Sequence, residues 1–160
     1  MALTRLNNQA LTGITSAGLP SGSIIQVQHV SPTTQTNNAA NNSWADATNF
    51  SINITPTSSS SKFYISSSAG CLHNNNGYIG FRIYRDNATV VQQNWSYHNR
   101  NEAWNGILNM ALSAVDEPAT ASQVNYKIQV FSTQNAGQFY FNYVGSNGNI
   151  GGFTVMEIAG

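Results

Sequence analysis

The chain has 160 residues, few enough for a single domain and enough to bury a core without disulfides. Only 8% of the residues are charged, and six basic side chains balance six acidic ones. This weak charge argues against nucleic acid and against an anionic membrane surface as partners, because both are bound mainly through clustered lysine and arginine.

The first 22 residues differ from the rest of the chain. They carry apolar side chains at loose helical spacing, but glycine and proline at positions 13, 18, 20 and 22 prevent a long helix. A frayed tail is one interpretation. We favour an attachment arm over residues 1–22, whose apolar side chains a partner surface receives, followed by a folded domain over residues 23–160. The attachment residues would be Leu3, Leu6, Leu11 and Ile14.

Alternating apolar and polar residues predict strands through the first half of the domain. In residues 23–30, Ile25, Val27 and His29 share one face and two glutamines the other. A polar loop is expected over 31–43, and the turn "RDNAT" joins two later strands. The residues expected to face inward in this half are Phe50, Ile52, Ile54, Phe63, Ile65, Ile79, Phe81 and Ile83.

The second half continues the same pattern. Its expected inward residues are Leu108, Met110, Leu112, Val124, Tyr126, Ile128, Val130, Phe139, Phe141 and Tyr143. Many short strands separated by turns, without a repeat of about 20–50 residues, are typical of an antiparallel sandwich and not of a propeller or solenoid. We therefore predict an all-β, jelly-roll-like β-sandwich.

The closing strand, over 153–158, has two largely apolar faces, and each needs a cover. Burying a large apolar side chain contributes roughly 1.5–3 kcal/mol, so an uncovered face is costly. A homo-oligomer would supply the second cover, and the scarcity of charge does little to keep copies apart. Burial within the monomer, with loop 31–43 as a lid, is the alternative. The predicted interface residues are Phe153, Val155, Glu157 and Tyr140.

The sequence offers little chemistry. It contains no GxSxG, Walker or HExxH motif, and His29, His73 and His98 fall on separate predicted elements, so we expect no enzyme activity, no cofactor and no metal. A glycosidase carboxylate pair is a distant alternative. The single Cys71 excludes an internal disulfide and is expected to be a small buried side chain. No run of about 20 apolar residues predicts a membrane span, and the N-terminus lacks a signal-peptide run.

Two features stand apart from this plain background. Glu157 lies between apolar residues, so it either reaches solvent at a sheet edge or is buried against a hydroxyl, a backbone donor or an arginine such as Arg82.

Aromatic residues also lie in or beside Asn-rich segments, where sugar rings could stack on them while amides bind the hydroxyls. The same residues could equally anchor loops or a protein interface. They are Trp44, Trp95, Tyr97 and Trp104.

Several segments resemble small virion structural proteins of tailed bacteriophages, those of cyanobacteria and other aquatic hosts above all. They are the opening "MALTRLNNQALTGITSAGLPSGSIIQVQHV", the turn in "FSINITPTSSSSKFYI", the hairpin "GFRIYRDNAT" and the ending "FTVMEIAG". The resemblance implies a trimeric, jelly-roll-like domain on the particle exterior, made in the host cytoplasm and attached by its N-terminal arm. It brings no catalytic motif.

Two roles follow from this resemblance. The first is a capsid cement or decoration homotrimer whose arm binds the major capsid protein or another virion protein, favoured because the chain is short and has no long shaft. The alternative is a tail-fibre or head-fibre tip that binds a host-surface glycan through the tryptophan and tyrosine side chains.

Overall fold

The computed structural model describes residues 19–37, 42–73, 76–98, 106–133, 139–143 and 151–160. These residues form ten strands and no helix, so no helix among them could cross a membrane. The strands are β1 (Ile24–Val30), β2 (Thr36–Asn37), β3 (Trp44–Ile54), β4 (Lys62–His73), β5 (Gly77–Arg85), β6 (Thr89–His98), β7 (Gly106–Asp116), β8 (Val124–Ser132), β9 (Phe139–Phe141) and β10 (Gly152–Ile158).

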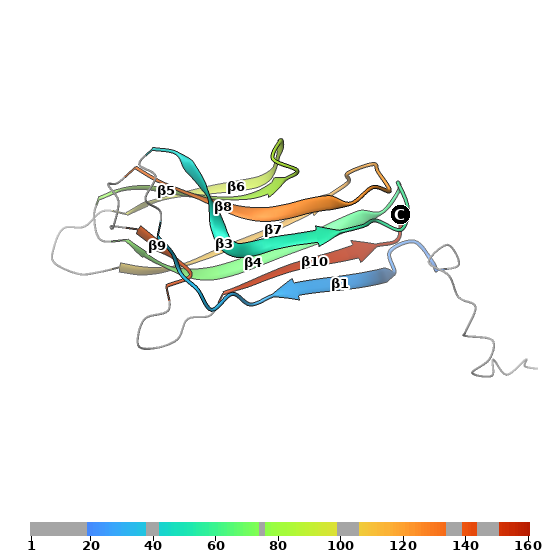
Figure 1. Ribbon diagram of the computed structural model, residues 1–160, viewed down its shortest axis with the longest axis horizontal. Helices are drawn as coiled ribbons and strands as arrows, with labels where there is room; N and C mark the ends of the chain where they lie inside the picture. Colours follow the sequence, from blue (N-terminus) through green and yellow to red (C-terminus); the bar gives the residue numbers. More distant parts are fainter. Residues whose placement is uncertain (1–18, 38–41, 74–75, 99–105, 134–138, 144–150) are drawn as a thin grey trace, which may run out of the picture.

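Two antiparallel sheets pack face to face (Figure 1). In the first, which we call the β10 sheet, the long strands lie in the order β1-β10-β4-β7, and short β9 continues beside β4 with β2 next to it. The second, the β8 sheet, has the order β3-β8-β5-β6. Eight long strands that alternate between two four-stranded layers in this order form a jelly roll. The predicted fold class is confirmed.

Side chains from both inner faces fill the space between the sheets. Residues expected to face inward from the alternation in β3, β4, β5, β7 and β8 are buried or packed against the buried core. The two layers meet through aromatic contacts: the ring centroid of Phe141 lies 4.9 Å from that of Phe50 and 5.2 Å from that of Phe81. The period-2 pattern therefore identified most of the core.

The alternation places Tyr143 on the same side as Phe139 and Phe141, but those two side chains are buried and Tyr143 is only half-buried. Asn142 adopts a left-handed conformation (φ 55°), which ends the strand alternation one residue earlier. The Asn142 side chain is buried, donating to the Pro32 carbonyl at 2.6 Å and accepting from the Gly151 N–H at 2.7 Å. Tyr143 is thereby turned toward Tyr140, with ring centroids 6.1 Å apart.

The face of β1 that its residue types suggest would be buried points toward solvent. Val27 and His29 are exposed, while Val30 packs against the core. An irregularity in the β1–β10 register between Ile24 and Gln26 determines which residues of β1 face inward. The inward side of β1 therefore carries Gln26, a polar residue.

The predicted oligomer interface on β10 is also wrong. Phe153, Val155 and Glu157 are fully buried inside the monomer, so they are not available to a second copy. The face is covered within the monomer, as the alternative had it, but by side chains of the β8 sheet and not by loop 31–43 as a lid. The half-buried outward residues of β10 are instead Thr154, Met156 and Ile158.

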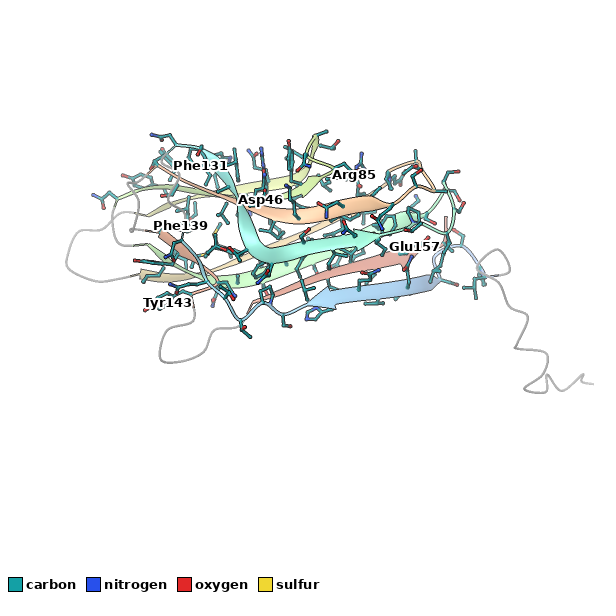
Figure 2. All side chains as sticks on the ribbon, viewed as in Figure 1. Asp46, Arg85, Phe131, Phe139, Tyr143 and Glu157 are labelled. Carbon is teal, nitrogen blue, oxygen red and sulfur yellow. The ribbon has the colours of Figure 1, made fainter. Side chains whose placement is uncertain are left out.

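Glu157 is buried with hydroxyl, amide and backbone donors around it (Figure 2). Its Oε1 accepts from the Thr57 N–H and hydroxyl, both at 2.7 Å, and from the Ser61 hydroxyl at 2.6 Å. Its Oε2 accepts from the Gln26 amide at 2.5 Å. Arg82, the partner suggested by the sequence, lies on the other sheet and bonds Gln129.

Residues 19–23 join the domain beside its carboxyl end. The Gly22 N–H donates to the Ala159 carbonyl, and the Ala159 N–H donates to the Ser23 carbonyl, each at 2.8 Å. Leu19, where the described part of the chain begins, therefore lies near this end of the sandwich (Figure 1). The four predicted attachment residues, Leu3 to Ile14, lie outside the described residues.

Candidate functional site: the two outer sheet faces

The outer side of the β8 sheet carries a group of aromatic residues. Cross-strand pairing places Trp44, Phe131, Gly80 and Trp95 in one row across all four strands. Tyr78 pairs with Tyr97 in the adjacent row. We call this surface, formed by Trp44, Tyr78, Trp95, Tyr97 and Phe131, the aromatic face.

The rings of the aromatic face contact one another. Trp95 lies 5.3 Å from Trp44 and 5.1 Å from Phe131 between ring centroids, both in edge-to-face geometry. The rings of Tyr78 and Tyr97 are 4.9 Å apart. About half of the surface of Trp95, Tyr97 and Tyr78 reaches solvent (46%, 55% and 54%). Exposed aromatic clusters of this kind mark binding surfaces more often than packing.

Gly80 makes this arrangement possible. A Cβ atom at position 80 would lie 2.8 Å from Trp44 Cη2 and 2.9 Å from Trp95 Cζ3. The two indole rings therefore lean over the glycine backbone, that of Trp95 from neighbouring β6 and that of Trp44 from β3 across β8, and any side chain there would displace them.

Three of the four predicted glycan-binding residues come together here. Trp44, Trp95 and Tyr97 lie on the aromatic face, and Trp104 lies outside the described residues. Sequence reasoning missed Tyr78, Phe131 and Gly80. The hairpin turn at Asp86 could not have indicated Tyr78, because a register irregularity between Ile83 and Tyr84 moves the partner of position 78 from residue 96 to Tyr97.

A polar row borders the aromatic face. Asp46, Gln129, Arg82 and Gln93 are consecutive cross-strand partners. The Arg82 guanidinium carbon lies 4.2 Å from the ring centroid of Trp44 and 4.4 Å from that of Tyr84. Its Nε and Nη2 donate to Gln129 Oε1 at 2.9 and 2.6 Å. Arg82 is thus held between two rings in one orientation.

The other charged residue of this row, Asp46, pairs with Lys127. Lys127 Nζ and the Gln129 amide each donate to the Asp46 carboxylate at 2.6 Å. Partial burial alone would raise the pKa of Asp46, but these bonds and the positive charge of Lys127 outweigh it and hold the pKa below its ordinary value. Asp46 is therefore ionised at neutral pH and committed to Lys127.

The outer side of the β10 sheet is apolar at the end where Gly22 and Ser23 bond Ala159. Val27, Met156, Tyr64 and Val115 are consecutive cross-strand partners, one from each long strand. We call this row the apolar strip. More than half of Val27 and Val115 is exposed (52% and 58%), and Ile24 beside them is equally open. None of the described residues covers these exposed side chains, so the strip is an apolar surface open to a partner.

Small polar residues continue this face beyond the strip. A shallow groove of about 380 Å³ is lined by His29, Thr154, Gly152 and neighbouring serines of β4 and β7. His29 is hydrogen-bonded through Nδ1 to the Thr154 hydroxyl at 2.8 Å and through Nε2 to the Ser31 hydroxyl at 2.7 Å. No carboxylate takes part in these bonds, so the histidine has no acidic group to orient it as a base in the part of the chain described.

Other chemistry-bearing groups are structural where the model describes them. Cys71 is fully buried, as predicted, and burial raises the pKa of its thiol to about 12, which keeps it unreactive. Within the described ranges, no three His, Cys, Asp or Glu side chains gather as metal ligands would.

No protein-family model and no curated protein sequence matches the chain. Among solved structures it is similar to Eiger TNF from S. frugiperda, at 11% identity and a TM-score of 0.47, covering 87% of this chain and 89% of that one. It is also similar to a chain of the infectious bursal disease virus Gx strain, at 12% identity and a TM-score of 0.46. That match covers 86% of this chain and 37% of the viral one. These likenesses are too remote to bear on function, and the fold assignment rests on the strand order itself.

Proposed function

We propose that the protein is a structural protein of a bacteriophage particle that acts as a homotrimer on the particle exterior, as capsid cement or decoration. The apolar strip is the observation that carries the proposal of self-association. Val27 and Val115 stand exposed on a rigid sheet, and covering them with a second copy removes apolar surface from water at about 25 cal/mol per Å². The virion context and the trimer rest on the sequence resemblance.

The strip replaces the interface expected from the sequence. It lies on the same strand, β10, but on its outer face, where Met156 joins Val27 and Tyr64. Lys62 and Glu117, two residues along the chain from Tyr64 and Val115, are paired with each other at 2.8 Å, so these two charges compensate one another.

Sedimentation velocity on single lysine variants tests self-association. Val27→Lys or Val115→Lys should convert the trimer into a monomer with little change in melting temperature, because both side chains are largely in solvent in the monomer. Val90→Lys is the matched control, since this valine is also exposed (44%) but lies on the β8 sheet. A trimer that survives both changes to the strip would refute the proposed interface.

The attachment role of residues 1–22 has its own test. Deleting residues 1–20 removes all four predicted attachment side chains and keeps Gly22 and Ser23, which bond Ala159. The shortened protein should remain a folded trimer and no longer bind purified particles. Unchanged incorporation would refute the arm.

The aromatic face favours a second candidate function, a fibre-tip protein that binds a host-surface glycan. Trp44, Trp95 and Tyr97 come from strands far apart in sequence and meet on one exposed surface beside amide side chains. Trp95→Ala should abolish adsorption to host cells in this case and should leave it unchanged for a cement protein.

A further inference from the structure

We propose that the aromatic face and Arg82 form a binding site for a linear acidic oligosaccharide, a sugar chain that carries a carboxylate. Sugar rings would lie against Tyr97 and Trp95, and the carboxylate would meet Arg82. The inference rests on the second candidate function and narrows it from glycans in general to one chemical class.

The shape of the site points to a chain and not to a single sugar. Tyr97, Trp95 and Gln93 are alternate residues of β6, so they point to one side at intervals of about 7 Å. Their cross-strand partners Tyr78, Gly80 and Arg82 follow in the same order on β5. Aromatic contacts therefore come first along the strand direction and polar contacts next, which suits an extended ligand with rings in sequence.

The charge of the site selects an anion. The charged side chains of the polar row are Asp46 and Arg82, and Lys127 lies in the next row, opposite Ser51 and Tyr84. Lys127 is paired with Asp46 at 2.6 Å, whereas no carboxylate of the described residues lies within ion-pair distance of Arg82. Asp46 also attracts Arg82 electrostatically, but two cations and one carboxylate leave a net charge of +1 among these three side chains, complementary to one carboxylate of a ligand.

The guanidinium is already oriented for this contact. Stacking on Trp44 and Tyr84 fixes its plane, and Gln129 accepts from Nε and Nη2. Nη1 makes no hydrogen bond to the residues that the structure describes, so it remains a donor for the ligand. A donor fixed before binding loses little conformational entropy on complex formation, and a charge-assisted bond to a carboxylate is about twice as strong as a neutral one.

Isothermal titration calorimetry with matched ligands tests the proposal. The probes are oligogalacturonate, oligomannuronate and oligoglucuronate of the same length, each beside its methyl ester, which keeps the rings and removes the charge. We expect at least one acid to bind and its ester to bind at least tenfold more weakly at low salt.

Four variants of the full chain assign the contacts. Arg82→Gln should reduce binding of the acid to that of the ester, Arg82→Lys should retain part of the difference, and Trp95→Ala should abolish binding of both. Val90→Ala, at the far end of β6, should change neither. Thermal melts establish that each variant is folded. If Arg82→Gln does not fold, Arg82→Lys still tests whether the preference for the acid depends on Arg82.

The outcomes separate this inference from the proposals before it. Equal binding of acids and esters would overturn the acidic class and keep the glycan function, while no binding of any probe or of neutral glycans would overturn both. A charge preference that Arg82→Gln leaves intact would overturn the assigned site. None of these results bears on the trimer, which sedimentation tests.

Discussion

Glu157 shows how one buried residue can organise three segments of the chain. Its carboxylate takes donors from β1 through Gln26 and from the loop after β3 through Thr57 and Ser61, while it stands itself on β10. Burial alone would raise the pKa of Glu157, but the hydrogen bonds from Ser61, Gln26 and Thr57 outweigh burial and hold the pKa below its ordinary value. The charged form is therefore the one that the fold stabilises.

Glu157→Gln should lower the free energy of unfolding by about 2–4 kcal/mol at neutral pH, because an amide –NH2 would face donor groups. A folded pKa below the ordinary value means that this contribution is complete above the ordinary pKa and is lost as pH falls through the folded pKa. Urea unfolding from about pH 7 to about pH 3 should show the gap between wild type and variant narrowing.

Glu117→Gln is the matched control for that experiment. Glu117 is also a carboxylate near a strand end, but 63% of its side chain is exposed, and its pair with Lys62 lies on the surface. Its replacement should cost less than about 1 kcal/mol. If Glu157→Gln were equally mild, the buried hydrogen bonds would not hold the end of the sandwich together.

Gly80 is the second residue on which a local prediction rests. Gly80→Ala should disturb the contact of Trp44 with Trp95, since the added Cβ meets both rings at less than 3 Å. We expect a changed near-ultraviolet circular dichroism spectrum and a loss of about 1–3 kcal/mol in stability. Gly152→Ala is the control, because its nearest neighbour is the exposed ring of His29 at 3.0 Å. An unaltered spectrum for Gly80→Ala would contradict the packing described.

At the scale of the strands, the alternation of residue types predicted the core but not the orientation of every strand. In β3 and β5 the apolar face is the inner face, because Phe50 and Phe81 have only the opposite sheet to pack on. In β10 both faces are apolar, so composition cannot say which is covered. In β1 the inward side carries Gln26 because Glu157 needs a donor, and those residues are 131 positions apart. A single sequence without tertiary contacts could not reveal that pairing.

The aromatic face, too, could be predicted only in part from the sequence. The residue types indicated a surface of tryptophan and tyrosine, and β6 alone sets Trp95 and Tyr97 on one side. That Trp44 joins them depends on β8 lying between β3 and β5, an order that no local pattern contains. Binding residues on separate strands thus become visible only with the topology.

The two sheets are joined at one end by a polar cluster. Asp116, at the end of β7 in the β10 sheet, accepts from Arg85 of β5 and, at 2.7 Å, from the hydroxyl of Tyr126 of β8. Burial and the neighbouring Asp116 raise the pKa of Tyr126, so its hydroxyl stays a donor well into the alkaline range.

A double-mutant cycle between Asp116→Asn and Tyr126→Phe should give a coupling free energy of about 1 kcal/mol or more, measured by urea unfolding. The matched cycle pairs Asp116→Asn with Tyr84→Phe. The Tyr84 hydroxyl donates to the Asn87 carbonyl and does not meet Asp116, so that coupling should be close to zero. Equal couplings in both cycles would mean that Asp116 does not link the sheets through Tyr126.

At the scale of the whole molecule, the jelly roll separates two surfaces of different chemistry. The apolar strip lies on the outer side of the β10 sheet and the aromatic face on the outer side of the β8 sheet, with the core between them. Figure 2 shows Asp46 and Phe131 on the β8 layer, away from β1 and β10. One copy can therefore self-associate through the first surface while the second remains open to a ligand.

Salt should weaken binding at one of these surfaces and leave association through the other unchanged. In the proposed trimer the strip would bury apolar side chains beside the Lys62–Glu117 pair, so that trimer should be as stable in about 1 M NaCl as in about 0.1 M, since screening removes nothing that holds it. Binding of an oligouronate at Arg82 should weaken over the same range, because its selectivity is Coulombic. Sedimentation equilibrium measures the first and calorimetry the second. A trimer that dissociates in salt would show that charges and not the strip hold the copies together, which would place the interface elsewhere on the molecule.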